Sequence, residues 1–261
     1  MEKRRVIYYG DELNDEFSEA KIEPRLIDGS YEYCRDSLFR RFTAFFWYRI
    51  IATPVAFCWL KIAYRHKIFG REKLKPFRKT GIFLYGNHTH AIANTCIPSM
   101  VGFPRRTYII CSAANVSIPH IGLAAASMGA LPLPGCKEAY KNFRAAINRR
   151  IAEKAAVAIY PEAHIWPYYT GIRPFGDVSF GYPAALSAPV FAVTDTYKKR
   201  RFCKKPRIVT YVDGPFFPPE GANLREARAF LRSAVYAAMC ERAKSSDCAV
   251  IEYVKREEKD D

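Results

Sequence analysis

Short apolar runs that end abruptly at glycine or proline constrain the fold of this chain more than any other feature. Residues 82–85 lead into Gly86, and residues 155–160 lead into Pro161. Runs of this length and composition are typical of strands buried on both faces, as in a parallel sheet. Polar residues follow each run, and open α/β sheets place their sites at the carboxyl ends of such strands.

Strand and helix patterns alternate along most of the chain. We expect strands at 81–85, 106–111, 155–160, 190–196 and 207–212, a short extended piece at 129–134, and helices near 89–101, 117–128, 137–154, 180–187 and 226–244. This alternation predicts an α/β fold with a mostly parallel central sheet flanked by helices. The 261 residues, 49% of them hydrophobic, are ample for such a core.

Residues 38–65 are rich in aromatic side chains, but Arg49, Pro54 and Lys61 interrupt them. A membrane-spanning helix needs about 20 apolar residues without a central charge, so we expect two short helices broken near Pro54. Mixed basic and aromatic residues suit a membrane interface; the alternative is an amphipathic helix packed on the core. We divide the chain into an N-terminal arm at 1–37, an interfacial helical segment at 38–68, an α/β domain at 69–254 and a charged tail at 255–261.

The formal charge of +15 favours an anionic partner, which can be nucleic acid, an anionic membrane or a phosphorylated substrate. The basic residues are scattered and form no nucleic-acid-binding motif, so we expect no nucleic-acid partner. The eight cysteines form no CxxC or zinc-ligand spacing. We expect buried, reduced thiols, as at Cys58, Cys96 and Cys111, and a protein that is not secreted, because its first residues are too polar for a signal peptide.

The residues after the two apolar runs can carry chemistry. His88 follows the first run, and a neutral imidazole is a natural general base near pH 7. Glu162 follows the second run, where a carboxylate can also act as a helix cap or an ion-pair partner. An isolated histidine is often only structural. Together, His88 and Glu162 at neighbouring strand ends predict one cleft with a base and a carboxylate.

These residues resemble motifs of the glycerolipid acyltransferases. That family carries an Asn-His-x4-Asp block after a strand and a later Pro-Glu-Gly-Thr-Arg block; Asn87-His88 is similar to the first and Pro161-Glu162 to the second. Further landmarks that agree are Gly70–Leu74, Gly129–Leu133, Phe175, Gly181, Ala185 and Ala188–Val190. The resemblance covers about residues 40–215.

The resemblance implies an acyltransferase that acts in phospholipid synthesis at the cytoplasmic face of a membrane, as a peripheral or monotopic protein. An acyl group would pass from acyl-CoA or acyl carrier protein to the hydroxyl of a lysophospholipid, with lysophosphatidate the first expectation. His88 would take the hydroxyl proton, and the oxygen would attack the thioester directly. Neither a metal nor another cofactor is implied.

The chain departs from the first block at the residue that orients the histidine. The family's aspartate falls on Ala93, and Asn94 is one position further on. An asparagine can orient an imidazole but cannot stabilise its cation by charge. Either Asn94 serves in a slower enzyme, in which Asn94→Asp would raise turnover, or Glu162 or Asp195 supports His88. A catalytically weak or inactive lipid-binding relative of the same fold is the alternative function.

The second block departs at its phosphate-binding arginine, which falls on Ile165, and a further family arginine falls on Gly135. Lys137 and Arg173 lie close to these two gaps in sequence and are the candidate replacements. The expected catalytic residues are His88 and Asn94, and the expected substrate-binding residues are Asn87, Glu162, Lys137, Arg173 and His164. His90 and His164 can alternatively form a metal site with His88, although no cysteine or aspartate spacing favours this.

Overall fold

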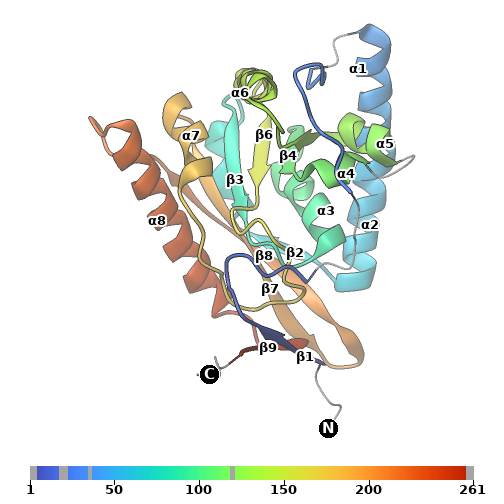
Figure 1. The fold of residues 1–261 in the computed structure, drawn as a ribbon. Coiled ribbons are helices and arrows are strands. Elements are labelled where there is room, and N and C mark those ends of the chain that lie inside the picture. Colours follow the sequence, from blue (N-terminus) through green and yellow to red (C-terminus); the bar gives the residue numbers. More distant parts are fainter. Residues whose placement is uncertain (1–4, 18–22, 35–36, 118–120, 257–261) are drawn as a thin grey trace.

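The computed structural model describes residues 5–17, 23–34, 37–117 and 121–256. Its centre is a seven-stranded sheet in the order β2-β8-β7-β3-β6-β4-β5 (Figure 1). The strands are β2 (Lys67–Phe69), β3 (Ile82–Gly86), β4 (Thr107–Cys111), β5 (Ala130–Pro132), β6 (Ala156–Ile159), β7 (Val190–Arg200) and β8 (Cys203–Phe216). All neighbouring pairs are parallel except β7 and β8. The predicted fold class is confirmed.

Helices cover both faces of this sheet. They are α3 (Ala91–Gly102), α4 (Ala113–Ser117), α5 (Ile121–Met128), α6 (Lys137–Ala152), α7 (Gly181–Leu186) and α8 (Leu224–Ala243), with short 3-10 turns η2 (Arg71–Phe77) and η3 (Val178–Phe180). One core cluster lies against α6 and α8 and includes Phe143 and Leu231. The other lies against α3 and includes Ile97. Because β3 and β6 contribute side chains to both clusters, every residue in these two strands is buried.

One long, mostly exposed helix runs along the flank of the molecule (Figure 1). It comprises α1 (Leu38–Phe45), the π-helical turn η1 (Phe46–Ala52) and α2 (Thr53–Tyr64). The expected break near Pro54 is wrong: Pro54 is in the first turn of α2, directly after the π turn, where Thr53 N–H donates to Tyr48 O five residues back. The wider π turn accommodates the proline ring without ending the helix. By length and composition, Leu38–Tyr64 could cross a membrane.

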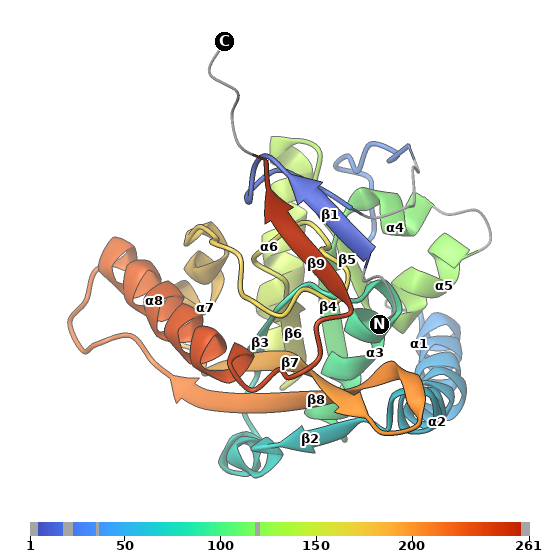
Figure 2. The same cartoon turned by 90° about the horizontal axis from the view of Figure 1, so that it is seen from below.

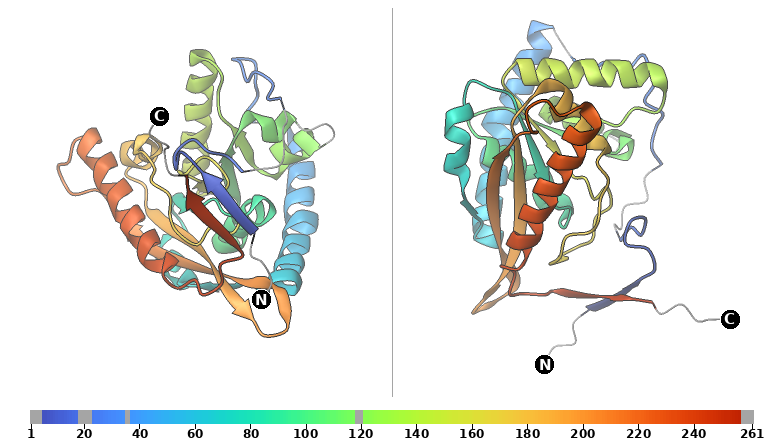
Figure 3. Two further views of the ribbon diagram at one scale, coloured as in Figure 1. Left: turned by 60° about the horizontal axis from the view of Figure 1, so that its bottom comes forward. Right: turned by 90° about the vertical axis from the view of Figure 1, so that its left-hand side faces the viewer.

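A separate two-stranded ribbon lies below the sheet (Figures 2 and 3). It pairs β1 (Arg5–Tyr9) with β9 (Ile251–Lys255) in parallel. Neither strand was expected, and residues 1–35, which contain β1, have weak periodicity. Lys255 and Arg256 are the described part of the expected charged tail, and the rest of that tail lies outside the described residues. The boundaries expected for the arm and the tail stay a prediction.

The eight cysteines form no disulfide with one another, and none of them is fully buried. The expected burial is wrong for Cys58, which is exposed, and for Cys96 and Cys111, which are half-buried. Cys58 is exposed because the helix that carries it has few neighbours. Apolar sequence surroundings therefore did not indicate a buried position in this segment.

Candidate active site

His88 lies immediately beyond the carboxyl end of β3, beside the end of β6. The two strands are adjacent and parallel, with Tyr85 opposite Ile159. Tyr160 directly follows β6, and its ring stacks on the imidazole of His88 with 4.6 Å between the ring centroids. The sheet register therefore fixes both the position and the plane of the imidazole. Nothing in the sequence pattern had indicated a role for Tyr160.

Asn94, in the first turns of α3, holds the imidazole of His88. Its Oδ1 lies 3.2 Å from His88 Nδ1 and accepts the backbone N–H of His90 at 2.8 Å. Its Nδ2 donates to Asn87 O at 3.4 Å and to Asp195 Oδ2 at 3.3 Å. Oδ1 thus faces donors and Nδ2 faces acceptors. This arrangement assigns the proton of a neutral His88 to Nδ1 and leaves the lone pair of Nε2 available to take a proton.

Asp195 on β7 stands behind Asn94 and supplies the carboxylate nearest to this amide. Burial raises its pKa to about 7, and the hydrogen bond from the Thr210 hydroxyl opposes that rise. Thr210 Oγ1 in turn lies 2.8 Å from Nε2 of His66. The result is a continuous series of hydrogen bonds from His88 through Asn94, Asp195 and Thr210 to His66, which directly precedes the edge strand β2.

Position 93 faces away from the hydrogen bonds that join His88, Asn94 and Asp195. Ala93 is completely buried in the core cluster between α2, α3 and the sheet. Successive residues in an α-helix point about 100° apart, so position 94 is the one that α3 turns toward His88.

Asn87 and Glu162 hold backbone segments and do not touch the imidazole. Asn87 Oδ1 accepts Asp195 N–H at 2.8 Å, and its Nδ2 donates to Asp195 O at 3.0 Å, so its side chain links β3 to β7. Glu162 Oε2 accepts His88 N–H at 2.8 Å, and Oε1 accepts Arg173 N–H at 3.0 Å. Burial raises the pKa of Glu162, while the His88 N–H and Arg173 lower it. These contacts give both residues a positioning role at the strand ends.

Arg173 is buried beneath the loop that follows β6. Its guanidinium donates to the carbonyls of Glu12, Glu162 and His164, and lies over the Trp166 ring at 4.9 Å from the centroid. The side-chain ion pair with Glu162 is long, at 3.9 Å, so the carbonyl contacts dominate. With 1% of its area exposed, Arg173 is placed to hold the loop, and this placement does not support its predicted contact with a phosphate.

The remaining predicted residues lie at the margin. His164 Nδ1 lies 3.4 Å from Glu16 Oε2, and a third of the His164 side chain is exposed. Lys137 is exposed at the start of α6, and within the described residues no hydrogen bond or ion pair joins it to the His88 group. Their predicted roles in substrate binding stay predictions.

His90 caps α3. Its Nδ1 accepts the Ala93 N–H at 3.3 Å, and its Nε2 lies 2.8 Å from the Tyr64 hydroxyl at the end of α2. This pair of contacts ties the long flanking helix to the first turn of α3. Over the described ranges, no three histidine, cysteine, aspartate or glutamate side chains are grouped so that they could hold a metal ion.

Burial lowers the pKa of His88 to about 4, and this effect outweighs the hydrogen bond to Asn94, which raises it. The imidazole is therefore neutral at pH 7, as a general base must be. A base with so low a pKa is weak, however, and gains strength only where nearby negative charge stabilises its cation. Glu16 raises the pKa of His88, and Asp195 is the carboxylate that bonds to the far side of the Asn94 amide.

The fold and this group of residues define an α/β domain in which a histidine follows an inner strand and the next helix supplies its partner. The crystal structure of 1-acyl-sn-glycerophosphate (LPA) acyltransferase, PlsC, from Thermotoga maritima is similar, with a TM-score of 0.56. The match covers 80% of this chain and 89% of that chain at 14% sequence identity, so it is a likeness of fold. No protein-family model matches this chain, and no curated protein sequence does.

Proposed function

We propose that this protein transfers a fatty acyl group from a thioester, acyl-CoA or acyl carrier protein, to the hydroxyl of a lysophospholipid, with lysophosphatidate as the first candidate. The observation that carries the proposal is His88, whose Nδ1 is bound to Asn94 while Nε2 keeps its lone pair. The similarity of the fold to that of an LPA acyltransferase supports the same reaction class.

In the proposed reaction, Nε2 of His88 accepts the proton of the lysolipid hydroxyl as its oxygen attacks the thioester carbonyl carbon. The carbon–sulfur bond then breaks, and the departing thiolate recovers the proton from the imidazolium. General-base catalysis of this kind contributes about 10²–10⁴-fold. Asn94 holds the imidazole in the reactive tautomer, and Asp195 lies 3.3 Å beyond it.

The proposed location is the cytoplasmic face of a membrane, with the protein bound peripherally or monotopically. The flanking helix α1–η1–α2 supports this proposal because it exposes a long apolar surface. Its exposed large hydrophobic residues are Leu38, Phe39, Phe42, Phe45, Phe46, Trp47, Ile50, Ile51, Val55, Phe57 and Ile62. If the protein docked on the membrane through this helix, the lysolipid would lie near the end of α2. There Tyr64 contacts His90, two residues after His88.

The test is acyl transfer by the purified protein to a panel of lysolipids, beginning with lysophosphatidate, with acyl-CoA and acyl carrier protein as donors. His88→Ala should lower turnover by about 10²–10⁴-fold. Arg78→Ala is the control, because Arg78 is exposed and precedes β3 whereas His88 follows it, and its turnover should stay close to that of the wild type. Undiminished turnover in His88→Ala would remove His88 as the base.

The alternative is a lipid-binding relative without efficient chemistry. The observation that favours it is the amide contact itself, since no carboxylate touches the imidazole of His88 in the described part of the chain. Binding of lysolipid by both wild type and His88→Ala, without His88-dependent transfer from either donor, would select this alternative.

A further inference from the structure

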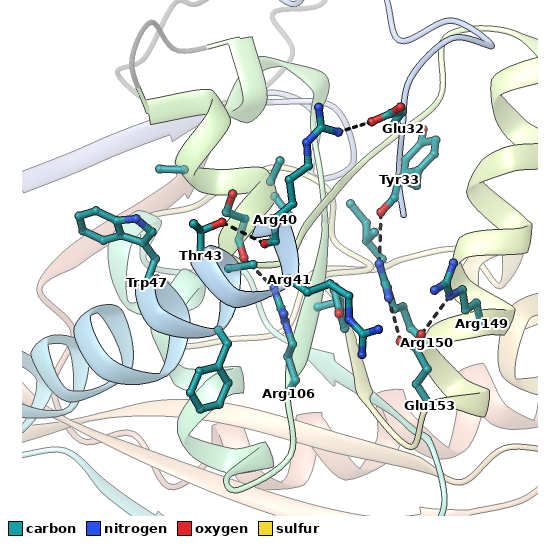
Figure 4. Close-up of a pocket in the computed structure, with 18 of the residues that line it drawn as sticks. Glu32, Tyr33, Arg40, Arg41, Thr43, Trp47, Arg106, Arg149, Arg150 and Glu153 are labelled. Carbon is teal, nitrogen blue, oxygen red and sulfur yellow. Dashed lines mark hydrogen bonds and ion pairs between the residues drawn. The ribbon is translucent and has the colours of Figure 1, made fainter. Parts of the chain in front are cut away.

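A cavity of about 980 Å³ lies at the β4–β5 edge of the sheet, beside the start of β4. It lies between α1, α5, the start of β4 and the end of α6 (Figure 4). Arg106 directly precedes β4, whereas His88 follows β3, and both strands run parallel to β6. A strand of five residues spans about 17 Å, so this cavity is separate from the candidate active site.

Arginines surround the cavity. Its described lining includes Arg40, Arg41, Arg106, Arg149 and Arg150 together with Glu32 and Glu153, a formal excess of three positive charges. Figure 4 shows Arg41 and Arg106 on one side of the space and Arg149 and Arg150 on the other. The cavity is large enough for a small organic ligand, and its charge favours an anion.

The carboxylates in the lining neutralise only part of this charge. The ion pairs join Arg40 to Glu32 at 2.7 Å, Arg149 to Glu153 at 3.0 Å and Arg150 to Glu153 at 2.8 Å. Arg41 and Arg106 have no carboxylate partner among the described residues. The cavity therefore offers two guanidinium groups that no acidic side chain of the described chain pairs with.

Packing fixes Arg106 in place before any ligand arrives. Its guanidinium lies over the rings of Tyr48 and Tyr108, at 5.3 and 5.1 Å from the centroids, and donates to Ser127 O at 2.6 Å. The buried Nε atoms of Arg106 and Arg150 have no hydrogen-bond partner within the described structure. Guanidinium groups held in this way are pre-organised for phosphate oxygens.

The wall formed by the flanking helix gives the cavity an apolar side. Phe45 and Trp47 line it, and about half of each side chain is exposed. They continue into the exposed surface at Leu38, Phe39 and Phe42. A ligand that combines a phosphate with acyl chains fits this combination of a basic cavity and an apolar helix surface.

We infer that this cavity binds the phosphate of an anionic phospholipid, as a lipid site separate from the site of acyl transfer. The arginines would contact the phosphate, and the acyl chains would lie along α1. The inference does not depend on the proposed enzymatic activity, because a protein without acyl transfer could bind lipid here.

Calorimetric titration with dihexanoyl-phosphatidylglycerol below its micelle concentration tests the site. The double variant Arg41→Gln/Arg149→Gln removes two exposed cavity arginines, and Arg78→Gln/Arg225→Gln removes two exposed arginines elsewhere as a control of equal charge. We expect affinity to fall by about tenfold or more in the cavity variant and by less than about twofold in the control. The same titrations use His88→Ala and glycerol phosphate.

Each comparison supports or overturns the inference. Unchanged binding by His88→Ala supports a separate site, and lost binding would assign the lipid to the active site instead. Equal losses in the two double variants would mean general attraction to the basic surface. Glycerol phosphate that binds as tightly as the lipid would make this a site for soluble phosphates, and a wild type that binds neither would leave no anion site.

Discussion

The carboxylate that lies behind Asn94 can be moved from β7 to α3 by exchanging two side chains. Asn94 Nδ2 lies 3.3 Å from Asp195 Oδ2, so Asn94→Asp alone would bring two carboxylates to about this separation. Two unit charges 3.3 Å apart repel by about 5 kcal/mol at an effective dielectric constant of about 20. The pair would then share one proton at neutral pH, and little new negative charge would reach His88.

The double exchange Asn94→Asp/Asp195→Asn removes this repulsion. The new carboxylate contacts His88 Nδ1 directly, and the new amide at 195 can donate to it while still accepting from Thr210. We expect the double variant to turn over at least about tenfold faster than Asn94→Asp, with an upper limit near 10⁴, the effect of exchanging the orienting aspartate for asparagine in a serine-protease triad. The structure thus revises the sequence-based expectation that Asn94→Asp alone raises turnover.

Turnover at saturating substrate would be compared among wild type, both single variants and the double variant at about pH 8, above the pKa of about 7 of Asp195. Urea unfolding of the same proteins checks the repulsion: Asn94→Asp should lose stability that the double exchange restores, as a coupling energy. If Asn94→Asp alone is as fast and as stable as the double variant, or Asp195→Asn loses no turnover, the Asp195 carboxylate does not act on His88.

Three further outcomes follow from burial and exposure. Burial lowers the pKa of His66 to about 4, so the free energy of unfolding should fall by about 3 kcal/mol more in wild type than in His66→Gln between pH 7 and pH 4, measured by urea titration. The ionisation of Asp195 near pH 7 should make turnover rise with pH through that value, and a pH–rate profile of Asp195→Asn should lack this rise. Trp47→Glu should weaken cosedimentation with anionic vesicles, whereas Phe230→Glu on α8, across the sheet from α1, should not (Figure 1).

The inner strands were predictable because burial on both faces leaves an uninterrupted apolar run. The hairpin of β7 and β8 extends beyond its prediction, because residues 197–206 are mostly charged or aromatic and their pairing depends on the partner strand. The ribbon of β1 and β9 joins opposite ends of the chain, and no local pattern could reveal that pairing. The long helix was misjudged because proline was treated as a break, although a π turn before it preserves the helix.

The site was predictable where it depends on single strand ends. His88 and Glu162 follow their strands as expected, and Asn94 lies where an orienting residue is needed. The choice between Glu162 and Asp195 as the supporting carboxylate could not be made from the sequence, because it depends on β7 lying beside β3. Tyr160 was missed because a tyrosine at a strand end is also an ordinary core residue.

The one-position shift from Ala93 to Asn94 is a consequence of how α3 is oriented. An aspartate at 93 would point into the apolar cluster around Ile97, where a carboxylate would be buried without a partner. Position 94 points at His88, but it also points at Asp195, and two buried carboxylates there would repel. An amide satisfies both neighbours, since its oxygen faces the imidazole and its nitrogen faces the carboxylate. In this fold, asparagine at 94 is therefore the residue that can contact both His88 and the carboxylate on β7.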